Sequence, residues 1–344
     1  MEQHKTFYVG IDISSETFTS SIGTTEQGWS VLGKTETFAN TQEGNKVYQK
    51  WLAHQDVKPG NSVICMENTG VYSEQIAYFL QSKEYQICIE TPLKVKRSFK
   101  VDGHKTDPVD SRQIAEYAYR FYDELRIWKP RREVLEQVKI LLATREQLVI
   151  QKTGHINSLK ALIRKVIRVA MAEELLETLI STLKDKIKAL ETEMNQLIQQ
   201  EADLAQEQAL LTSIPGVGKL LSAQALVLFH QMEGELSDKK LAAFIGICPY
   251  EHSSGTSVKR KAKTSQHGPV VIRKLLNLAA RSVCTHTPDY KQYYLRKLAE
   301  GKAKSLAINN VGNKLLSVMV AIFKSGIPYI PGYRSIHPRL LTKS

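Results

Sequence analysis

The sequence of 344 residues predicts three consecutive regions: an α/β domain built on a mixed sheet, a long helical coiled-coil region, and a mostly α-helical C-terminal domain. Three observations predict this order. Short apolar runs alternate with amphipathic segments in the first third of the chain, leucines recur at heptad spacing in the middle, and a Pro-Gly turn then separates two apolar helical segments. The predicted boundaries are 1–129, 130–206 and 207–344.

The N-terminal region begins with three predicted strands. FYVGIDIS and TFTSSIGT indicate the start of a hairpin, and WSVLGKTETFA indicates a third strand. A helix is expected over residues 41–54 with Thr41 as its N-cap, followed by the strand SVICMEN, the helix YSEQIAYFLQSK and the strand YQICIETP. With the helix that comes next, this order is the one expected for a ribonuclease H-like α/β domain.

Four carboxylates stand out in this region. Asp12 lies in the first strand and Glu67 ends the apolar run VICM, although a carboxylate near a core is costly without a partner. Asp107 and Asp110 lie in KTDPVDSRQIAEYAYRF, at the start of a predicted helix. Taken alone, this pair indicates helix capping, with Asp107 as the N-cap and Pro108 at the first helical position.

Considered together, the four acids indicate a metal site as well. The first and fourth strands of a ribonuclease H-like sheet are neighbours, and the first turn of the helix after the last strand points at their ends. Clustered carboxylates repel one another and raise one another's pKa unless a cation neutralises them. Mg²⁺ prefers such hard oxygen ligands and shares its other positions with water and phosphate. The predicted ligands are Asp12, Glu67, Asp107 and Asp110, and the last two also serve the helix start.

The middle region carries an apolar heptad seam. Ile180, Ile187 and Met194 fit a positions, and leucines at every seventh residue from Leu176 to Leu204 fit d positions. This pattern predicts either an antiparallel helical pair within one chain or a coiled coil that joins two chains.

The third region begins with a predicted helix–hairpin–helix, in which SIPGVGK joins two helical segments. Gly216 and Gly218 would let backbone N–H groups approach a phosphate at the start of the second helix, where Lys219 lies. A simple packing elbow between two helices is the alternative.

A basic segment follows it. Residues 252–288 contain no acid and seven Lys or Arg, which favours a track for nucleic-acid phosphates over a solvated face of mixed charge. Inside it, HSSGTS places Ser253 and Ser254 before a glycine. Such a serine is usually a turn residue, because a hydroxyl needs a base, a metal or clustered positive charge to act as a nucleophile. The predicted phosphate contacts in the segment are Lys259, Arg260, Lys261, Lys263, Arg273 and Lys274.

The bulk composition fits a protein that binds nucleic acid. The net charge is +12 and the isoelectric point about 9.3, which indicates a polyanionic partner. The four cysteines are scattered without a CxxC pair, as expected for buried residues in a reducing compartment. The sequence starts without a signal-peptide pattern, and no run approaches the ~20 apolar residues that cross a bilayer. We therefore expect a cytoplasmic protein that does not act at a membrane.

The order of the motifs GIDIS, CMENTG and HKTDPVDSRQIAE, followed by SIPGVG and by LAAFIGICPYEHSSGTSVKRKAKTSQHG, resembles the DEDD transposases of the insertion-sequence one-ten family over nearly the whole chain. The resemblance implies a RuvC-like N-terminal domain that binds Mg²⁺ through the four acids. It also implies that Ser254 is a nucleophile on DNA, with Ser253 as the near alternative and Ser257 as a weaker one. In KRKAKTSQHG, Gln266 and His267 depart from the family's usual Gly- and Arg-rich stretch.

The same resemblance implies a function and its partners. The expected activity is that of a bacterial DNA transposase or recombinase, a Mg²⁺-dependent strand transferase that forms a phosphoserine–DNA intermediate and needs no ATP. The expected partners are donor and target DNA, a structured bridge RNA, and further copies of the chain in dimers that assemble into a tetramer. The sequence also lacks a P-loop of the form GxxxxGK[ST].

Three other functions fit parts of the pattern. A RuvC-like junction endonuclease would use the same acids but hydrolyse DNA with water, without a covalent intermediate. An actin-like sugar kinase is suggested by GIDISSETF, which resembles a phosphate-binding hairpin, but the C-terminal half has no second Gly-rich phosphate motif. A non-enzymatic nucleic-acid-binding protein would explain the charge but not the four ordered acids.

Overall fold

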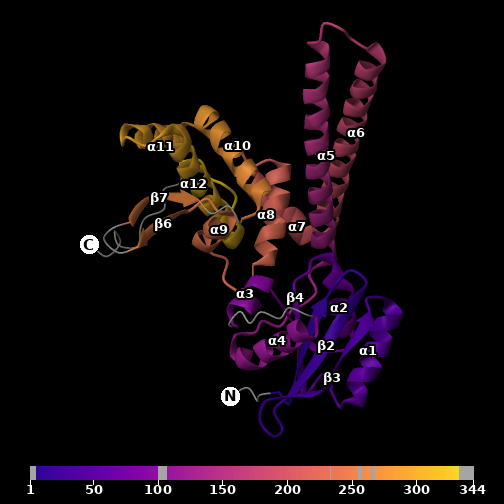
Figure 1. The fold of residues 1–344 in the computed structure, drawn as a ribbon. Helices are drawn as coiled ribbons and strands as arrows, with labels where there is room; N and C mark the ends of the chain where they lie inside the picture. The colour runs from indigo at the N-terminus through magenta and orange to yellow at the C-terminus, as the bar shows by residue number, and fades with distance from the viewer. Residues whose placement is uncertain (1–4, 100–106, 233, 255–257, 265–267, 333–344) are drawn as a thin grey trace, which may run out of the picture. The chain divides into compact units, whose positions relative to one another are not determined.

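The computed structural model describes residues 5–99, 107–232, 234–254, 258–264 and 268–332 (Figure 1). The chain divides into two compact units, Met1–Pro130 and Arg131–Ser344. The further division of the second part at residue 206 stays a prediction.

The first unit contains a five-stranded mixed sheet with the strand order β3-β2-β1-β4-β5. β1 is antiparallel to β2, which is antiparallel to β3, whereas β4 is parallel to both β1 and β5. The predicted neighbours β1 and β4 are paired, which confirms the α/β class and is compatible with a RuvC-like domain. The strands are β1 (Phe7–Ile13), β2 (Thr17–Thr24), β3 (Ser30–Ala39), β4 (Ser62–Glu67) and β5 (Gln86–Glu90).

Helices cover both faces of this sheet (Figure 1). Alternate residues of β1 and β4 point to opposite faces, so each strand contributes residues to two apolar clusters, one on each face of the sheet. Val9 and Ile64 pack with residues of α1 (Gln42–His54) and α2 (Val71–Ser82). On the other face, both strands pack with α3 (Pro92–Arg97) and α4 (Asp107–Arg120). The strands contribute Tyr8, Val63 and Cys65, and the two helices contribute Val95, Ile114 and Tyr117.

The predicted cap of α1 is confirmed. The hydroxyl of Thr41 accepts a hydrogen bond from the backbone N–H of Gly44 at 3.1 Å, which satisfies one of the free donors at the helix start. The short helix α3 was not expected from the sequence, although Pro92 occupies its first turn.

α4 lies directly on β1 at Gly10. A Cβ added to Gly10 would stand 2.1 Å from the backbone oxygen of Ser111 and 2.3 Å from the backbone nitrogen of Ala115, so only glycine permits this approach. The hydroxyl of Ser111 also forms a buried hydrogen bond of 2.8 Å with the hydroxyl of Ser21 on β2. These contacts fix the first turns of α4 over the sheet.

The second unit begins with two long helices that form an antiparallel pair within the chain, α5 (Glu133–Ile163) and α6 (Ala170–Gln200) (Figure 1). The predicted a-position residues Ile180, Ile187 and Met194 are buried. The heptad seam therefore joins two segments of one chain, one of the two alternatives that the sequence allowed.

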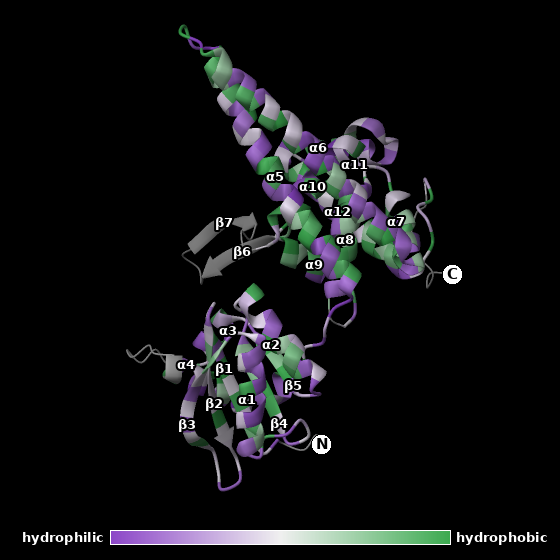
Figure 2. Cartoon of the chain, turned by 90° about the vertical axis from the view of Figure 1, so that its right-hand side faces the viewer, coloured by the Kyte–Doolittle hydropathy of each residue, from purple (hydrophilic) through white to green (hydrophobic). Residues whose placement is uncertain are grey.

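The remaining helices of the second unit share one apolar core. α8 supplies buried residues around most of its circumference, from Leu221 to Phe229, as expected for a central helix. Figure 2 colours this helix and its neighbours by the hydropathy of their residues. A two-stranded antiparallel hairpin, which the sequence analysis did not predict, interrupts the helices. The elements are α7 (Ala202–Thr212), α8 (Lys219–Gln231), α9 (Asp238–Ile245), β6 (Pro249–Ser254), β7 (Val258–Thr264), α10 (Val270–His286), α11 (Pro288–Ala299) and α12 (Lys304–Ser325).

Among the described helices, α12 is the one long and apolar enough by composition to span a membrane. Its residues Val311, Leu315 and Met319 are fully buried in the core of the second unit. This burial is the pattern of a core helix, and such a helix on its own is weak evidence for a membrane span.

The packing at Gly10 leads to a stability prediction. We expect Gly10→Ala to destabilise the first unit by roughly 1–3 kcal/mol or more, because the added methyl overlaps the backbone of α4. All three tryptophans, Trp29, Trp51 and Trp128, lie in this unit, so tryptophan fluorescence during urea unfolding measures it specifically.

Gly60→Ala is the matched control for Gly10→Ala. Its added methyl would meet nothing within 4 Å, so we expect a change between zero and about 1 kcal/mol of stabilisation. Equal unfolding midpoints for the two variants would contradict the close approach of α4 to β1.

Candidate active site and nucleic-acid interface

Two of the predicted acids lie side by side at one edge of the sheet. β1 and β4 run parallel, and their last paired residues are Ile11 and Met66. Asp12 and Glu67 are the next residue on each strand, at the carboxyl end of both. Gly10 of β1 and Cys65 of β4 lie on the face of the sheet that α4 covers. Because side chains alternate between the two faces of a strand, Asp12 and Glu67, two residues further on, lie on that face as well. Both side chains are half-buried.

The first turn of α4 carries the second pair of acids. Asp110 is half-buried and immediately precedes Ser111, which is tied to β2. The next residue, Arg112, donates from Nε to the hydroxyl of Thr35 on β3 at 3.2 Å. Asp107 is the first residue of α4, three positions before Asp110 and hence on the same side of the helix. The helix thus begins at Asp107 itself, one residue before the predicted start at Pro108, so Asp107 does not occupy the predicted N-cap position. Its side chain lies outside the described residues.

A fifth acid, which was not predicted from the sequence, extends the row. Glu90 ends β5 and is paired with Glu67 in the parallel register of β4 and β5. Glu90 is buried, and its Oε1 accepts a hydrogen bond of 2.9 Å from Nζ of Lys94 in α3. The signal was present in the sequence, because CIET repeats the pattern of CMEN: an acid that ends an apolar run.

The acids give this edge of the sheet a negative potential. The pKa of the Cys65 thiol is raised, mainly by burial and further by Cys88 and by the negative charges of Glu90 and Glu67. Lys94 offsets part of this charge at Glu90. A cation at this edge would therefore be stabilised.

The described side chains alone do not complete a metal site. Among them, no three His, Cys, Asp or Glu side chains lie close enough to hold one ion. The side chain of Asp107 lies outside the described residues. The backbone thus brings Asp12, Glu67 and the first turn of α4 to one end of the sheet, and the four-acid site stays a prediction.

The predicted nucleophile lies on the unexpected hairpin. Ser254 is the last residue of β6 and faces Val258 of β7 across the hairpin, while Ser253 faces Lys259 and His252 faces Arg260. Basic residues of β7 thus run alongside the two serines. Side-chain positions of this hairpin, and residues Ser257, Gln266 and His267, lie outside what the structure describes.

The two glycines of the predicted helix–hairpin–helix differ in their surroundings. Gly216 has a φ of +80°, and a Cβ there would stand 2.6 Å from Cγ1 of Val283 on α10. Gly216 is therefore required by packing within the second unit, as in the elbow alternative. A Cβ on Gly218 would meet nothing within 4 Å, and exposed Lys219 begins α8 beside it. The open helix start at Gly218 and Lys219 remains the better candidate for a phosphate.

Two predicted phosphate contacts on α10 have different surroundings. Nζ of Lys274 lies 2.9 Å from Oε1 of Glu146 on α5, so its charge is already paired. The sequence could not show this, since the acid comes from a helix 128 positions away. Arg273 lines a hollow between α10 and α12, together with Asn277 and Asn309.

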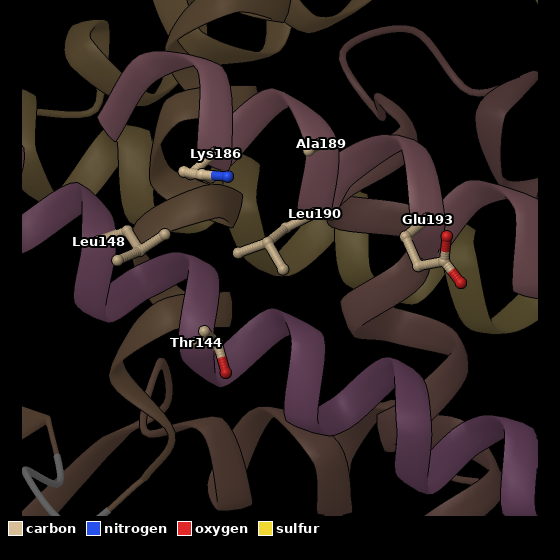
Figure 3. Close-up of a pocket in the computed structure, with 6 residues that line it drawn as sticks. All are labelled: Thr144, Leu148, Lys186, Ala189, Leu190 and Glu193. Atoms are coloured by element: carbon tan, nitrogen blue, oxygen red, sulfur yellow. The ribbon is translucent and has the colours of Figure 1, made fainter. Parts of the chain in front are cut away.

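A second hollow lies on the α5–α6 pair (Figure 3). The picture shows apolar Leu148 and Leu190 between the two helices, flanked by Lys186 and Glu193. The hollow contains neither the predicted acids nor the serines, so we assign no chemistry to it.

Comparisons with known proteins match both halves of the chain. Residues 9–168 match a family model described as transposase, the DEDD transposase of IS110, and residues 208–295 match one described as transposase of the IS116/IS110/IS902 family. The first match covers the acids and the second covers the hairpin that carries the serines.

Curated relatives agree with these matches. The chain is 26% identical to the pilin gene-inverting protein of Moraxella lacunata over 329 residues, which cover 94% of this chain and 97% of the relative. It is also 26% identical to the transposase for insertion sequence element IS1111A of Coxiella burnetii, over 64% of this chain and 67% of the relative.

The different surroundings of Lys219 and Lys274 give a binding prediction. Lys219→Gln should lower the slope of log affinity for duplex DNA against log salt concentration by about 1, as expected for one lost phosphate contact. Lys274→Gln removes the same charge but one already paired with Glu146, so the slope should stay unchanged. A filter-binding titration at several salt concentrations measures both, and a larger loss for Lys274→Gln would reverse the assignment.

Proposed function

Since the chain belongs to the IS110 family of transposases, we propose that it cuts and rejoins DNA through a serine-linked intermediate, with Mg²⁺ held by Asp12, Glu67, Asp107 and Asp110. The main support is the register of β1 and β4, which puts Asp12 and Glu67 next to each other on the face that α4 covers. Adjacent carboxylates repel each other, and a cation bound between them would offset that repulsion.

The acids would act on the phosphate by holding the metal. Mg²⁺ bound there would supply positive charge that stabilises the developing charge on the scissile phosphate. Asp12 and Glu67 would contribute from the rigid sheet, while Asp107 and Asp110 would contribute from the first turn of α4. The Ser21–Ser111 hydrogen bond and the approach at Gly10 hold that turn in place.

Ser254 would supply the nucleophile. Its Oγ loses a proton and attacks the phosphorus, the bond from phosphorus to the 3′ oxygen breaks, and that oxygen takes a proton to become a free 3′-hydroxyl. The protein is then esterified to the DNA phosphate. The 3′-hydroxyl of a partner strand later attacks the same phosphorus, and Oγ leaves and regains a proton. The energy of the broken linkage is conserved in the ester, so ATP is not required.

The partners follow from the same family. The relative from Moraxella lacunata is named for inverting a pilin gene, and we propose that this chain likewise rearranges DNA segments. A structured bridge RNA that pairs with donor and target DNA, and dimers that join into a tetramer, complete the proposal. The net charge of +12 is large enough to serve both nucleic acids. RNA that co-purifies with the protein and pairs with both DNA sites would support guidance.

The metal site can be tested by changing a carboxylate to its amide. Asp12→Asn and Glu67→Gln should each lower strand cleavage by more than about 100-fold, since loss of an outer-shell partner alone costs 10–100-fold. Without metal, each change removes a like-charge repulsion, so the melting temperature should stay the same or rise. Added Mg²⁺ should raise the melting temperature of the wild type but not that of Asp12→Asn or Glu67→Gln.

Glu74→Gln is the matched control, because Glu74 is an exposed acid on α2, on the opposite face of the sheet. It should keep both cleavage and the Mg²⁺-dependent rise in melting temperature. Wild-type cleavage by Asp12→Asn and Glu67→Gln in Mg²⁺ would rule out the metal site.

The serine can be tested by trapping its ester. A nicked DNA substrate should yield a protein–DNA adduct that survives denaturation, because the strand beyond the nick is lost before resealing. Ser254→Ala should eliminate the adduct, while Ser253→Ala should only reduce it. Both variants should bind DNA as the wild type does, since one neutral hydroxyl adds little to a contact made by many Lys and Arg.

Two other results would change the proposal. An adduct that persists in Ser254→Ala and disappears in Ser253→Ala would move the nucleophile by one residue. Efficient cleavage without an adduct in any variant would indicate attack by water, as in a RuvC-like junction endonuclease.

A further inference from the structure

Three cations surround one aromatic ring in the second unit. The ring centroid of Tyr293 lies 5.1 Å from Cζ of Arg296, 5.5 Å from Nζ of Lys297 and 5.0 Å from Nζ of Lys314. The first three residues belong to α11 and Lys314 belongs to α12, which packs beside it. We call these four residues the Tyr293 cluster.

The cluster is part of a strongly basic surface. Residues 288–315 contain six Lys or Arg and only two acids, so this stretch carries a net charge of +4. The side chain of Arg296 is 63% exposed, and Lys314 is exposed as well. Like charges gathered at one ring repel one another, and an anion bound to them would relieve the repulsion.

The protein neutralises this surface only in part. Glu300 pairs with Lys297 at 2.8 Å and lies 3.9 Å from Nε of Arg296 and 3.7 Å from Nζ of Lys302. These cations lower the pKa of Glu300, chiefly through the hydrogen bond from Lys297. Within the part of the chain that the structure describes, Lys314 has no carboxylate partner in an ion pair. The carboxylate of Glu300 is therefore shared by Arg296, Lys297 and Lys302. The charge of Lys314 is available to a ligand.

The Tyr293 ring holds three cations close to it. Cations are attracted to the face of an aromatic ring, so the three side chains lose less freedom when a phosphate binds them. Tyr293 also packs partly against the core of the second unit, which fixes the ring. A base would have to displace cations in order to stack there, whereas a phosphate would contact them directly.

We infer that the Tyr293 cluster binds the phosphate backbone of duplex DNA, in addition to the contacts predicted at residues 259–263 and at Arg273. A preordered set of cations fits the regular phosphates of a stiff duplex better than those of a flexible single strand. The contact is independent of sequence, because it reaches no base edge. This inference rests on the proposed function only in its choice of DNA as the polyanion.

The test compares two pairs of variants in the full-length protein, with a 30-base-pair duplex of arbitrary sequence as the probe. Lys314→Gln should lower the slope of log affinity against log salt by about 1. Lys184→Gln, an exposed lysine on α6 among residues of both charge signs, should leave the slope unchanged.

The second pair isolates the ring. Tyr293→Leu keeps an apolar side chain against the core but removes the aromatic face, and should weaken duplex binding at low salt about threefold. Tyr294→Leu is its control, because Tyr294 also packs against the core but has no cation over its ring among the described contacts. It should bind as the wild type does, and melting temperatures confirm that all four variants fold.

The outcomes separate this inference from the proposed function. Unchanged duplex binding in Lys314→Gln and Tyr293→Leu, with the Ser254 adduct intact in the wild type, would overturn the inference alone. Weaker binding to a structured RNA with unchanged duplex binding would overturn the choice of DNA. We expect Lys314→Gln and Tyr293→Leu to bind duplex DNA more weakly than the wild type and to give the normal yield of adduct at saturating DNA. The binding assay does not require DNA cleavage. It therefore tests the Tyr293 cluster even if the wild type forms no adduct.

Discussion

The contact between α4 and β1 at Gly10 is the constraint on which the candidate active site depends. Two of the four predicted ligands lie on strands whose register is fixed by backbone hydrogen bonds, and the other two lie on a helix that packs on the face of the sheet. The helix can stand over the strand ends only because Gly10 lacks a side chain. The buried Ser21–Ser111 hydrogen bond then sets its position along the sheet.

Charge is distributed differently in the two units. The acids gather at the carboxyl ends of β1, β4 and β5, where Glu90 and Lys94 add a pair that the proposed chemistry does not use directly. This Glu90–Lys94 ion pair lowers the net negative charge beside Glu67 without removing any predicted ligand. In the second unit, the surplus of cations lies on the hairpin, at the start of α8 and around Tyr293. The first arrangement suits a cation and the second suits a polyanion.

Ion pairs within the fold decide which cations are free to bind nucleic acid. The segment 252–288 has no acid in its own sequence, yet Lys274 is paired with Glu146 of α5. Likewise, Gly216 looks from its motif like a phosphate contact but is needed for packing against Val283. The residues with open surroundings, Gly218 and Lys219, are therefore the stronger candidates from that motif.

The sequence by itself determined the three initial strands, the cap at Thr41 and the heptad seam, because each depends on local periodicity or on a short-range hydrogen bond. The pairing of β1 with β4 was predicted from the order of the elements, which is that of a ribonuclease H-like domain, and not from any local pattern. It also identified the family through the order of its motifs.

Only the tertiary structure decided which of these features lie next to one another. It joined the seam within one chain, placed Glu90 beside Glu67, put Ser254 on a hairpin, and gathered three cations at Tyr293. Those contacts link residues that are distant in sequence or lie on different elements. They depend on how elements pack, which local sequence patterns do not specify.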